Sequence, residues 1–383
     1  MTDPVNDFSM PATQHWVASN QQLAALCQQL QSSPSLAIDT EFMRTNTYFP
    51  KLALIQLSDG EQCWLIDVLE IDEFAPLKAL LEGPELVLIF HAPGEDFEVL
   101  DHALSIVPNN IFDTQVAAGL VNIGYSMGYA RLVAHVFDIE LGKEDTRSDW
   151  MIRPLSDRQK RYAADDVLYL HRLYKILSGQ LAEQQRHNWL DEEMLGLLEA
   201  SAQRKKAVDY YLRVKGAWRL QGSSLAVLKS LCDWREETAR SLDKPRSHIV
   251  KDNVLLELAN SMPTTMGQLH RIDDWYSRSV KRFGEDVLQL IADVDHDNIP
   301  ESLPQPLSRA VADVMKTMRA RLNEVAEDHG IPKELMSNKK ELEAILRSVV
   351  QGECQWPIRL TDGWRVAMVT PALQSVIESS DSL

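Results

Sequence analysis

Short apolar segments follow one another in the first quarter of the chain, and each has the length of a β-strand. They are rich in Leu, Ile and Val. Between the second and the third, Asp59 and Gly60 are typical of a tight turn, which predicts an antiparallel hairpin. The predicted strands cover residues 35–42, 52–57, 63–68 and 86–91.

Beyond residue 93 the spacing of the apolar positions becomes helical. Helices that follow a group of strands cover the resulting sheet. This order predicts an α/β or α+β layered domain, with a mixed sheet and helices packed on it. The predicted helices cover residues 94–104, 114–121, 127–137 and 157–183.

From about residue 184 onward only helical periodicity remains, and prolines interrupt it. Two stretches of this part are similar at an offset of 87 residues, including a shared proline after which a helix restarts. A solenoid needs at least three shorter units, so the pattern predicts two copies of one small helical domain. The matched positions are Leu228, Leu231, Ala239, Pro245 and Leu255, which recur as Met315, Met318, Ala326, Pro332 and Leu342.

One stretch between the helical parts differs in composition from its surroundings. Residues 295–306 are rich in prolines and polar side chains, as interdomain linkers are. We therefore expect an N-terminal domain over residues 1–200, a first helical domain over 201–294 and a second over 307–383.

The charges are distributed unevenly. The net charge is −17, and residues 1–200 alone account for it with 13 basic and 30 acidic side chains. Residues 201–291 carry 16 basic and 11 acidic side chains, a net charge of +5, and residues 292–383 carry −5. The basic part is either ordinary solvated surface or a module that holds a polyanion which the acidic domain would repel.

The composition excludes several classes of protein. No run approaches the ~18 apolar residues of a membrane span, and the N-terminus lacks the basic start and apolar core of a signal peptide. The four cysteines lie far apart without a C-x-x-C pair, which argues against a disulfide framework or a zinc site. We expect a cytoplasmic protein that does not associate with membranes.

The first predicted strand carries two acidic side chains on one face. Asp39 and Glu41 are two residues apart, and the residues before them are apolar, as in an interior strand. Two ionised carboxylates in such surroundings repel each other unless a cation neutralises them. The alternative is that both lie at the strand end and face water.

A second acidic site follows the strand at 86–91, where His91 leads through a turn into a helix. Asp96 lies in the first helical turn, where an acidic side chain also simply complements the helix dipole. His91 either contacts a phosphate or satisfies the turn.

The third site lies on the predicted helix 157–183. Ser156 and Gln159 are typical of a capping box at its start. Tyr162 and Asp166 are spaced i, i+4 and share a face. Asp165 also lies within one turn of Tyr162, so spacing alone leaves either aspartate as the functional one.

Together these sites offer four carboxylates, enough to hold two divalent cations. An oxygen-rich set of this kind suits Mg²⁺ or Mn²⁺. Two such metals ~3.5–4 Å apart stabilise the attacking and the leaving oxygen of a phosphoryl displacement. Tyr162 can then orient or deprotonate the attacking water. The sequence has no phosphate-binding loop of the G-x-x-x-x-G-K-[ST] type and no G-x-S-x-G motif, which argues against ATP hydrolysis and serine hydrolase chemistry.

The order of these motifs resembles a known superfamily. D-T-E on a first strand, H-A-x-x-x-D after a later strand and Y-x-x-x-D on a helix are similar to the four-carboxylate 3′→5′ exonucleases of the tyrosine-bearing branch. Three further motifs resemble the bacterial ribonuclease D family: F-D-T-Q (112–115), S-D-W-x-x-R-P-L (148–155) and R-Y-A-A-D-D-V (161–167). The helical parts resemble tandem HRDC domains, the helicase-and-ribonuclease-D C-terminal fold. The resemblance covers nearly the whole chain.

The resemblance implies a fold and a set of site residues. The fold is a ribonuclease H-like exonuclease domain, a mixed sheet with flanking helices, followed by two small all-α domains. Asp39, Glu41 and Asp166 would ligate the metal that activates water, and Asp39 would bridge to a second metal near Asp96. The family spacing selects Asp166 over Asp165, and Tyr162 would position the nucleophile.

The resemblance also implies a function: a 3′–5′ exoribonuclease that uses two divalent cations, Mg²⁺ or Mn²⁺. It would release nucleoside 5′-monophosphates from the free 3′-hydroxyl ends of structured RNA, notably tRNA precursors, without ATP or an obligate protein partner. Two alternatives remain at this point, a 3′–5′ DNA exonuclease and a non-catalytic RNA-binding adaptor.

Substrate contacts are less defined by the sequence. Phe42 and Met43 either stack on terminal bases or belong to the core. Arg153 either contacts phosphate or forms a structural ion pair. The second helical domain, being acidic, either binds RNA or braces the other domains. Basic candidates for gripping RNA in the first helical domain are Arg204, Lys205, Lys206, Arg213, Lys215, Lys281 and Arg282.

Overall fold

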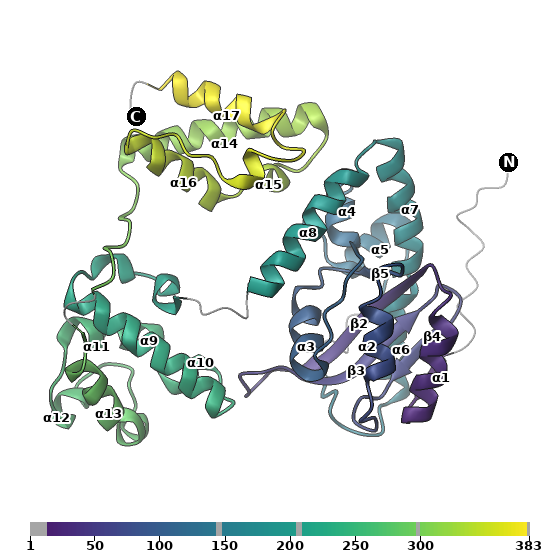
Figure 1. Cartoon of the computed structure of the whole chain (residues 1–383), viewed down its shortest axis with the longest axis horizontal. Coiled ribbons are helices and arrows are strands. Elements are labelled where there is room, and N and C mark those ends of the chain that lie inside the picture. Colours follow the sequence, from purple (N-terminus) through teal and green to yellow (C-terminus); the bar gives the residue numbers. More distant parts are fainter. Residues whose placement is uncertain (1–13, 143–147, 204–208, 296–298, 381–383) are drawn as a thin grey trace. The chain divides into compact units, whose positions relative to one another are not determined.

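The computed structural model describes residues 14–142, 148–203, 209–295 and 299–380. Of the candidates for gripping RNA, Arg204, Lys205 and Lys206 lie outside these residues. The described chain forms two compact units (Figure 1). Unit 1 comprises residues 1–43, 51–203 and 307–383, and unit 2 comprises residues 44–50 and 204–306.

A mixed sheet of six strands lies at the centre of unit 1. Its strand order is β1-β4-β3-β2-β5-β6, so β2 is an inner strand, as the apolar start of this segment predicts. β3 pairs antiparallel with β2 and with β4, which confirms the predicted hairpin, and the other pairs are parallel. The strands are β1 (Gln14–Val17), β2 (Ser35–Met43), β3 (Lys51–Ser58), β4 (Cys63–Ile66), β5 (Val87–Phe90) and β6 (Ile111–Asp113).

Helices pack on this sheet and give the predicted α/β class. The predicted helix 157–183 is interrupted at Tyr169, where the structure has two separate helices. The helices are α1 (Asn20–Leu30), α2 (Ala75–Leu81), α3 (Gly94–Leu104), α4 (Thr114–Leu120), α5 (Tyr129–Phe137), α6 (Asp157–Leu168), α7 (Leu170–Glu183) and α8 (His187–Gln203).

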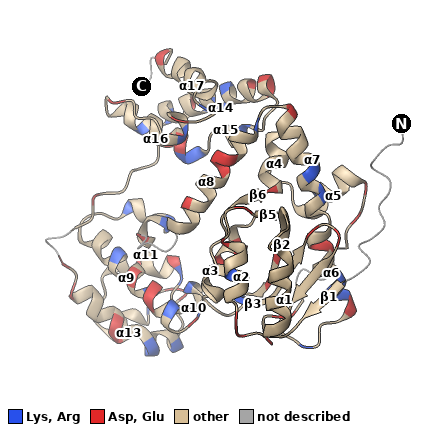
Figure 2. Cartoon of the chain, turned by 45° about the vertical axis from the view of Figure 1, so that its right-hand side comes forward, with Lys and Arg blue, Asp and Glu red and all other residues tan. Residues whose placement is uncertain are grey.

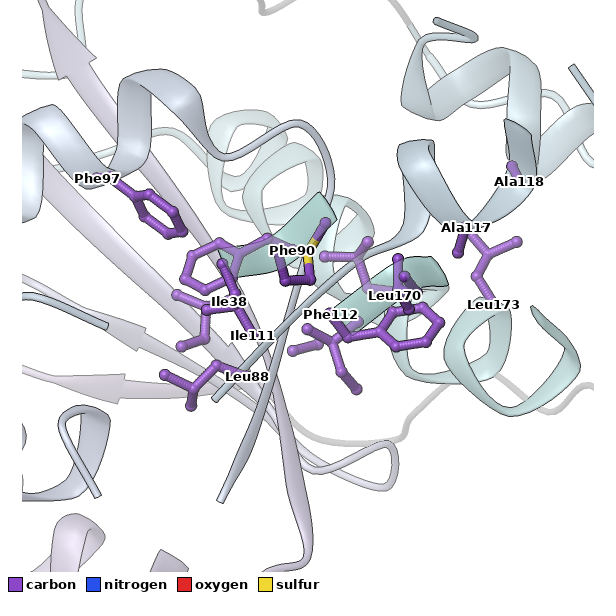
Figure 3. Packing of buried hydrophobic residues seen from close by; sticks show 14 of the residues in the cluster. Ile38, Leu88, Phe90, Phe97, Ile111, Phe112, Ala117, Ala118, Leu170 and Leu173 are labelled. Atoms are coloured by element: carbon purple, nitrogen blue, oxygen red, sulfur yellow. The ribbon is translucent and has the colours of Figure 1, made fainter. Parts of the chain in front are cut away.

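The core of the sheet is built from aliphatic side chains of neighbouring strands and aromatic side chains that lock the helices onto them. Phe90 of β5 meets Phe97 of α3 edge to face, with ring centroids 5.4 Å apart. Phe112 of β6 meets Tyr174 of α7 in the same way at 4.8 Å. Figure 3 shows Ile38, Leu88 and Ile111 gathered beside Phe90. This packing fixes β2 and the start of α3, the two elements from which three of the predicted acidic residues come.

The C-terminal helices also belong to unit 1. They are α14 (Arg309–His329), α15 (Lys333–Met336), α16 (Lys339–Val350) and α17 (Val369–Glu378), with a 3₁₀ turn at Ile358–Leu360. They dock on α8, where the Trp189 and Trp364 rings stack 4.7 Å apart and the buried Arg365 forms an ion pair with Glu193.

Unit 2 is helical, apart from the loop 44–50. Its helices are α9 (Ser223–Ser241), α10 (Arg246–Ile249), α11 (Asp252–Ser261), α12 (Met266–Leu269) and α13 (Ser277–Ala292), with 3₁₀ turns at Tyr210–Arg213 and Ala217–Arg219. α10 and α15 begin 87 residues apart, and so do α11 and α16. The helix starts therefore recur at the offset of the sequence repeat, which supports the interpretation of a duplicated domain.

The structure describes all four cysteines and the helices that composition was used to assess. Cys27, Cys63, Cys232 and Cys354 are free cysteines, so the chain contains no disulfide framework. Among the helices of the described residues, none combines the length and the apolar character needed to cross a bilayer.

Candidate active site

Asp39 and Glu41 lie where β2 extends beyond one of its neighbours. β5 pairs with β2 only at Ser35, Leu36 and Ala37, whereas β3 pairs with it from Ala37 to Met43. At Asp39 and Glu41, the edge of β2 that faces β5 therefore has no paired strand. Both acidic residues are half-buried. A register shift between Glu41 and Phe42 interrupts the regular pairing with β3 just beyond them.

Asp166 completes a group of three carboxylates. Asp39, Glu41 and Asp166 each offer an oxygen atom, and these atoms all lie within 4.8 Å of one another. The predicted capping box starts α6 at Ser156, and α6 packs on β2, β3 and β4. Of the two aspartates that the helical spacing left open, Asp166 and not Asp165 joins the cluster.

Asp96 adds a fourth carboxylate beside this group. It lies in the first turn of α3, is 9% exposed, and accepts a hydrogen bond from the hydroxyl of Thr40 on β2. The negative charge of Asp96 raises the pKa of both Asp39 and Glu41, so the four acidic side chains form one electrostatic cluster.

Burial and mutual repulsion hold the protons of this cluster tightly. Burial, followed by the charges of Asp96, Asp166 and Glu41, raises the pKa of Asp39 well above its ordinary value. The pKa of Glu41 rises to about 9 for the same two reasons, and burial raises that of Asp96 to about 6. Burial also raises the pKa of Asp166, to about 7. A bound divalent cation would offset the burial and the repulsion that raise these pKa values. Carboxylate oxygens are also ligands that such cations prefer.

Tyr162 stands at the edge of the cluster. Its hydroxyl donates a hydrogen bond to the Asp166 carboxylate, which lowers the pKa of Asp166 against the effect of burial. Its ring packs near Trp150, with centroids 6.1 Å apart. The i, i+4 spacing predicted from the sequence therefore brings the phenol into direct contact with a predicted metal ligand.

Two polar residues that support the cluster were not predicted. Thr40 lies between the two acidic residues of β2 and binds Asp96. Tyr129 of α5 is half-buried, donates a hydrogen bond to the backbone carbonyl of Asp165 over 2.8 Å, and accepts one from the amide of Tyr169 over 3.3 Å. Tyr129 thereby ties α5 to the end of α6. No local pattern marks it, because its partners lie 36 and 40 residues away.

His91 and Arg153 are engaged within the protein. The two ring nitrogens of His91 lie 2.9 Å from the Thr114 hydroxyl and 3.0 Å from the Met127 carbonyl oxygen, and burial lowers its pKa to about 4. The guanidinium of Arg153 binds both carboxylate oxygens of Asp67, each over 2.7 Å. These contacts favour the structural interpretation of each residue.

Phe42 and Met43 end β2, directly after the acidic pair. Both are half-buried, and Phe42 packs partly against the core of unit 1. Partial exposure of an aromatic side chain leaves both alternatives open, stacking on a base and contribution to the core.

Two family models match the chain. One, described as a 3′–5′ exonuclease, matches residues 14–182, and the other, described as the HRDC domain, matches residues 224–291. Ribonuclease D of Pseudomonas paraeruginosa is 40% identical over 371 residues, which cover 95% of this chain and 98% of that protein. Ribonuclease D of Escherichia coli is 32% identical, covering 94% and 98%.

The solved structures agree with these matches. The crystal structure of Escherichia coli RNase D, described as an exoribonuclease involved in structured RNA processing, superposes with a TM-score of 0.87 at 30% identity, covering 96% of this chain and 99% of that one. The catalytic core of RRP6 from Trypanosoma brucei shares the fold, with a TM-score of 0.57 at 24% identity over 75% of this chain and 81% of that one.

The mixed sheet and its cluster of carboxylates define a 3′–5′ exonuclease, a hydrolase whose acidic site implies a divalent metal. Its near full-length relatives make it an exoribonuclease. The chain belongs to the ribonuclease D family.

The raised pKa values predict how stability depends on pH when no metal is bound. The folded state holds these protons more tightly than the unfolded chain does, so the protonated cluster contributes fully to stability below about pH 4. This contribution is lost as the pH rises through the pKa values of Asp96, Asp166 and Glu41, which are about 6, 7 and 9. In chelator, the melting temperature of Glu41→Gln should therefore rise relative to that of the unsubstituted protein between pH 6 and pH 9.

Metal should reverse this trend, because it binds the ionised carboxylates. Thermal melts with Mg²⁺ should show a larger gain in melting temperature at pH 8 than at pH 6. Equal gains at both pH values, or a Glu41→Gln difference that does not change with pH, would contradict the electrostatic account of the cluster.

Proposed function

We propose that the protein removes nucleoside 5′-monophosphates one at a time from the 3′ ends of structured RNA, with tRNA precursors as its main substrates, and that two divalent cations, Mg²⁺ or Mn²⁺, serve this reaction. The observation that carries the proposal is the meeting of Asp39, Glu41 and Asp166 within 4.8 Å, with Asp96 beside them. The description of the Escherichia coli relative as an exoribonuclease of structured RNA supports the substrate class.

The four carboxylates divide into two overlapping ligand sets. Asp39, Glu41 and Asp166 would hold one cation, and Asp39 with Asp96 would hold the second. Bound there, the metals supply positive charge for the attacking and leaving oxygens of the phosphodiester. Thr40 holds the Asp96 carboxylate in place through its hydrogen bond, which keeps the second ligand set aligned with the first.

Tyr162 acts on the water that attacks the terminal phosphodiester. Its hydroxyl contacts the Asp166 carboxylate and so stands beside the ligand set that would hold this water. A phenol in this position orients the water by a hydrogen bond and passes its proton toward Asp166 or the solvent. We assign Phe42 and Met43, directly after the acidic pair, to stacking against the terminal bases. The phosphodiester bond breaks at its 3′ oxygen, which leaves a new 3′-hydroxyl end and a nucleoside 5′-monophosphate.

The domain boundaries stay part of the proposal. We assign residues 1–200 to the exonuclease domain, 201–294 and 307–383 to two copies of one helical domain, and 295–306 to the linker. The recurring helix starts support the duplication. We also propose a cytoplasmic location, which four cysteines without disulfides support.

A DNA exonuclease is the rival that the acidic cluster does not by itself exclude, because metal-assisted phosphoryl chemistry is common to RNA and DNA and does not by itself distinguish the 2′-hydroxyl. Matched RNA and DNA strands of one sequence, each with a free 3′-hydroxyl, should be digested side by side with Mg²⁺. We expect mononucleotide release from RNA at least about 10-fold faster than from DNA, because a 2′-hydroxyl contact is the means by which a protein distinguishes the two. Equal rates would contradict the RNA assignment while leaving the nuclease chemistry intact.

A further inference from the structure

Gln56 is a fully buried polar side chain in an otherwise apolar stretch of β3. The residues on either side of it, Ile55 and Leu57, are also fully buried. In the part of the chain that the structure describes, neither the amide nitrogen nor the amide oxygen of Gln56 has a hydrogen-bond partner. A buried amide without partners lowers the stability of a fold, whereas an aliphatic side chain of similar size does not. The amide is therefore a candidate for a functional contact.

The strand register places Gln56 directly opposite Asp39. β2 and β3 lie side by side in the sheet (Figure 2), and Asp39 and Gln56 are partners in their antiparallel pairing. Residues that are directly opposite in such a pair project from the same face, with Cβ atoms roughly 4.5–5.5 Å apart. The side chain of Gln56 is long enough to carry its amide across this distance to the Asp39 carboxylate.

The other neighbours of Gln56 on this face are less suited to the amide. On β4 the residue opposite Gln56 is Leu65, which is buried and apolar. Two residues further along β3, Ser58 projects from the same face, and its hydroxyl already accepts a hydrogen bond from the backbone amide of Gly60 over 3.1 Å. The carboxylate of Asp39 is therefore the acceptor that the register places directly across from the amide.

We propose that Gln56 is a positioning residue for the metal site: its amide nitrogen donates a hydrogen bond to the Asp39 carboxylate when this carboxylate is ionised and holds a divalent cation. The inference rests on the proposed function, in which Asp39 is the ligand shared by both cations, and adds the group that fixes its orientation. Carboxylates that bind a metal are themselves hydrogen-bonded by surrounding residues. Such hydrogen bonds are often long or poorly aligned until the complex forms.

The remaining ligands show the same arrangement. Thr40 binds the carboxylate of Asp96, and the Tyr162 hydroxyl binds the carboxylate that α6 contributes to the cluster. Each of these two ligands is thus held by a neutral side chain that donates a hydrogen bond. Gln56 would do the same for Asp39, the ligand whose orientation matters to both cations.

Mn²⁺ binding, measured by isothermal titration of the full chain without RNA, tests the proposal. Gln56→Met keeps the length of the side chain and removes the amide. It should lower the affinity for Mn²⁺ about 10-fold or more, because the orientation of Asp39 is lost. In chelator it should raise the melting temperature by about 2 °C, because no unpartnered amide is buried. A side chain with a structural role alone would instead lower the melting temperature in chelator and leave the Mn²⁺ affinity unchanged.

Leu57→Met is the matched control, because it introduces the same side chain at the next residue of β3, on the other face of the sheet. It should keep the Mn²⁺ affinity within about twofold. Gln56→Leu removes the amide with a side chain typical of this strand and should reproduce the loss seen in Gln56→Met. An equal loss in Leu57→Met, or unchanged affinity in both Gln56 variants, would overturn the proposal.

Activity separates this inference from the proposed function. The Gln56 variants should need at least about 10-fold more Mg²⁺ for the half-maximal rate of mononucleotide release, while kcat at saturating Mg²⁺ stays within about fivefold. An unchanged Mg²⁺ requirement in an active enzyme would overturn the role of Gln56 alone. Failure of the unsubstituted protein to release mononucleotides from any RNA would overturn the proposed function, and the Mn²⁺ affinities would still decide the role of Gln56.

Discussion

Replacing Asp166 by asparagine should abolish mononucleotide release, with a loss of about 10³-fold or more in kcat, and Asp39→Asn should do the same. Each substitution removes one negative charge from a ligand set whose oxygens lie within 4.8 Å, so the set no longer neutralises a divalent cation. The measurement is the rate of release of labelled nucleoside monophosphate from a 3′-hydroxyl RNA with Mg²⁺ and, separately, with Mn²⁺.

Asp165→Asn is the matched control for this prediction. It changes the neighbouring residue of the same helix in the same way, but its side chain is outside the carboxylate group. This variant should keep its rate within about threefold. A loss in Asp165→Asn as large as that in Asp166→Asn would mean that the helix tolerates neither change, and full activity of Asp166→Asn would contradict the assigned ligand set.

Replacing Tyr162 by phenylalanine should lower kcat about 10²-fold while KM for RNA changes little. The substitution removes the hydroxyl that binds Asp166 and keeps the ring that packs near Trp150. General acid–base or orienting contributions of one such group are typically 10²-fold or more. Single-turnover measurements at saturating enzyme report the chemical step directly.

Tyr125→Phe removes an exposed phenol from the same domain and should leave the single-turnover rate unchanged. A rate for Tyr162→Phe equal to that of the unsubstituted protein would assign Tyr162 to packing. A rise in KM with unchanged kcat would assign it to RNA binding.

The inner part of the sheet could be predicted from apolar runs, whereas its edges could not. β2 to β5 are found within one or two residues of the predicted strands. β1 and β6 have four and three residues, too short for a periodic signal. The predicted helix 157–183 is two helices separated at Tyr169, where no proline or glycine marks the break.

The acidic cluster was accessible from sequence because each carboxylate lies in a regular element with a known period. The spacing placed Tyr162 and Asp166 on one face, and the structure shows the hydrogen bond between them. The polar side chains that support the cluster could not be predicted, because each of them contacts residues that are distant in the sequence. Thr40 contacts a residue 56 positions away, and Tyr129 binds backbone atoms 36 and 40 positions away.

Unit 2 shows the same limit more strongly. The local patterns predicted its helices and their repeat, but nothing in residues 44–50 indicates that Tyr48 is buried in its core and contacts Glu236, which lies 188 positions further along. The loop, together with the 3₁₀ turn at 210–213 and α10, lines a pocket of about 760 Å³ within unit 2. Among the basic residues selected from sequence that the structure describes, Arg213 alone lines this pocket.

A crystal of the protein soaked in Mn²⁺, with data collected at the manganese absorption edge, tests the central claim most directly. The account predicts two anomalous peaks, one among Asp39, Glu41 and Asp166 and one between Asp39 and Asp96, and a crystal of Asp39→Asn should lose both. Anomalous density that is absent from this cluster at saturating Mn²⁺, or peaks that persist unchanged in Asp39→Asn, would contradict it.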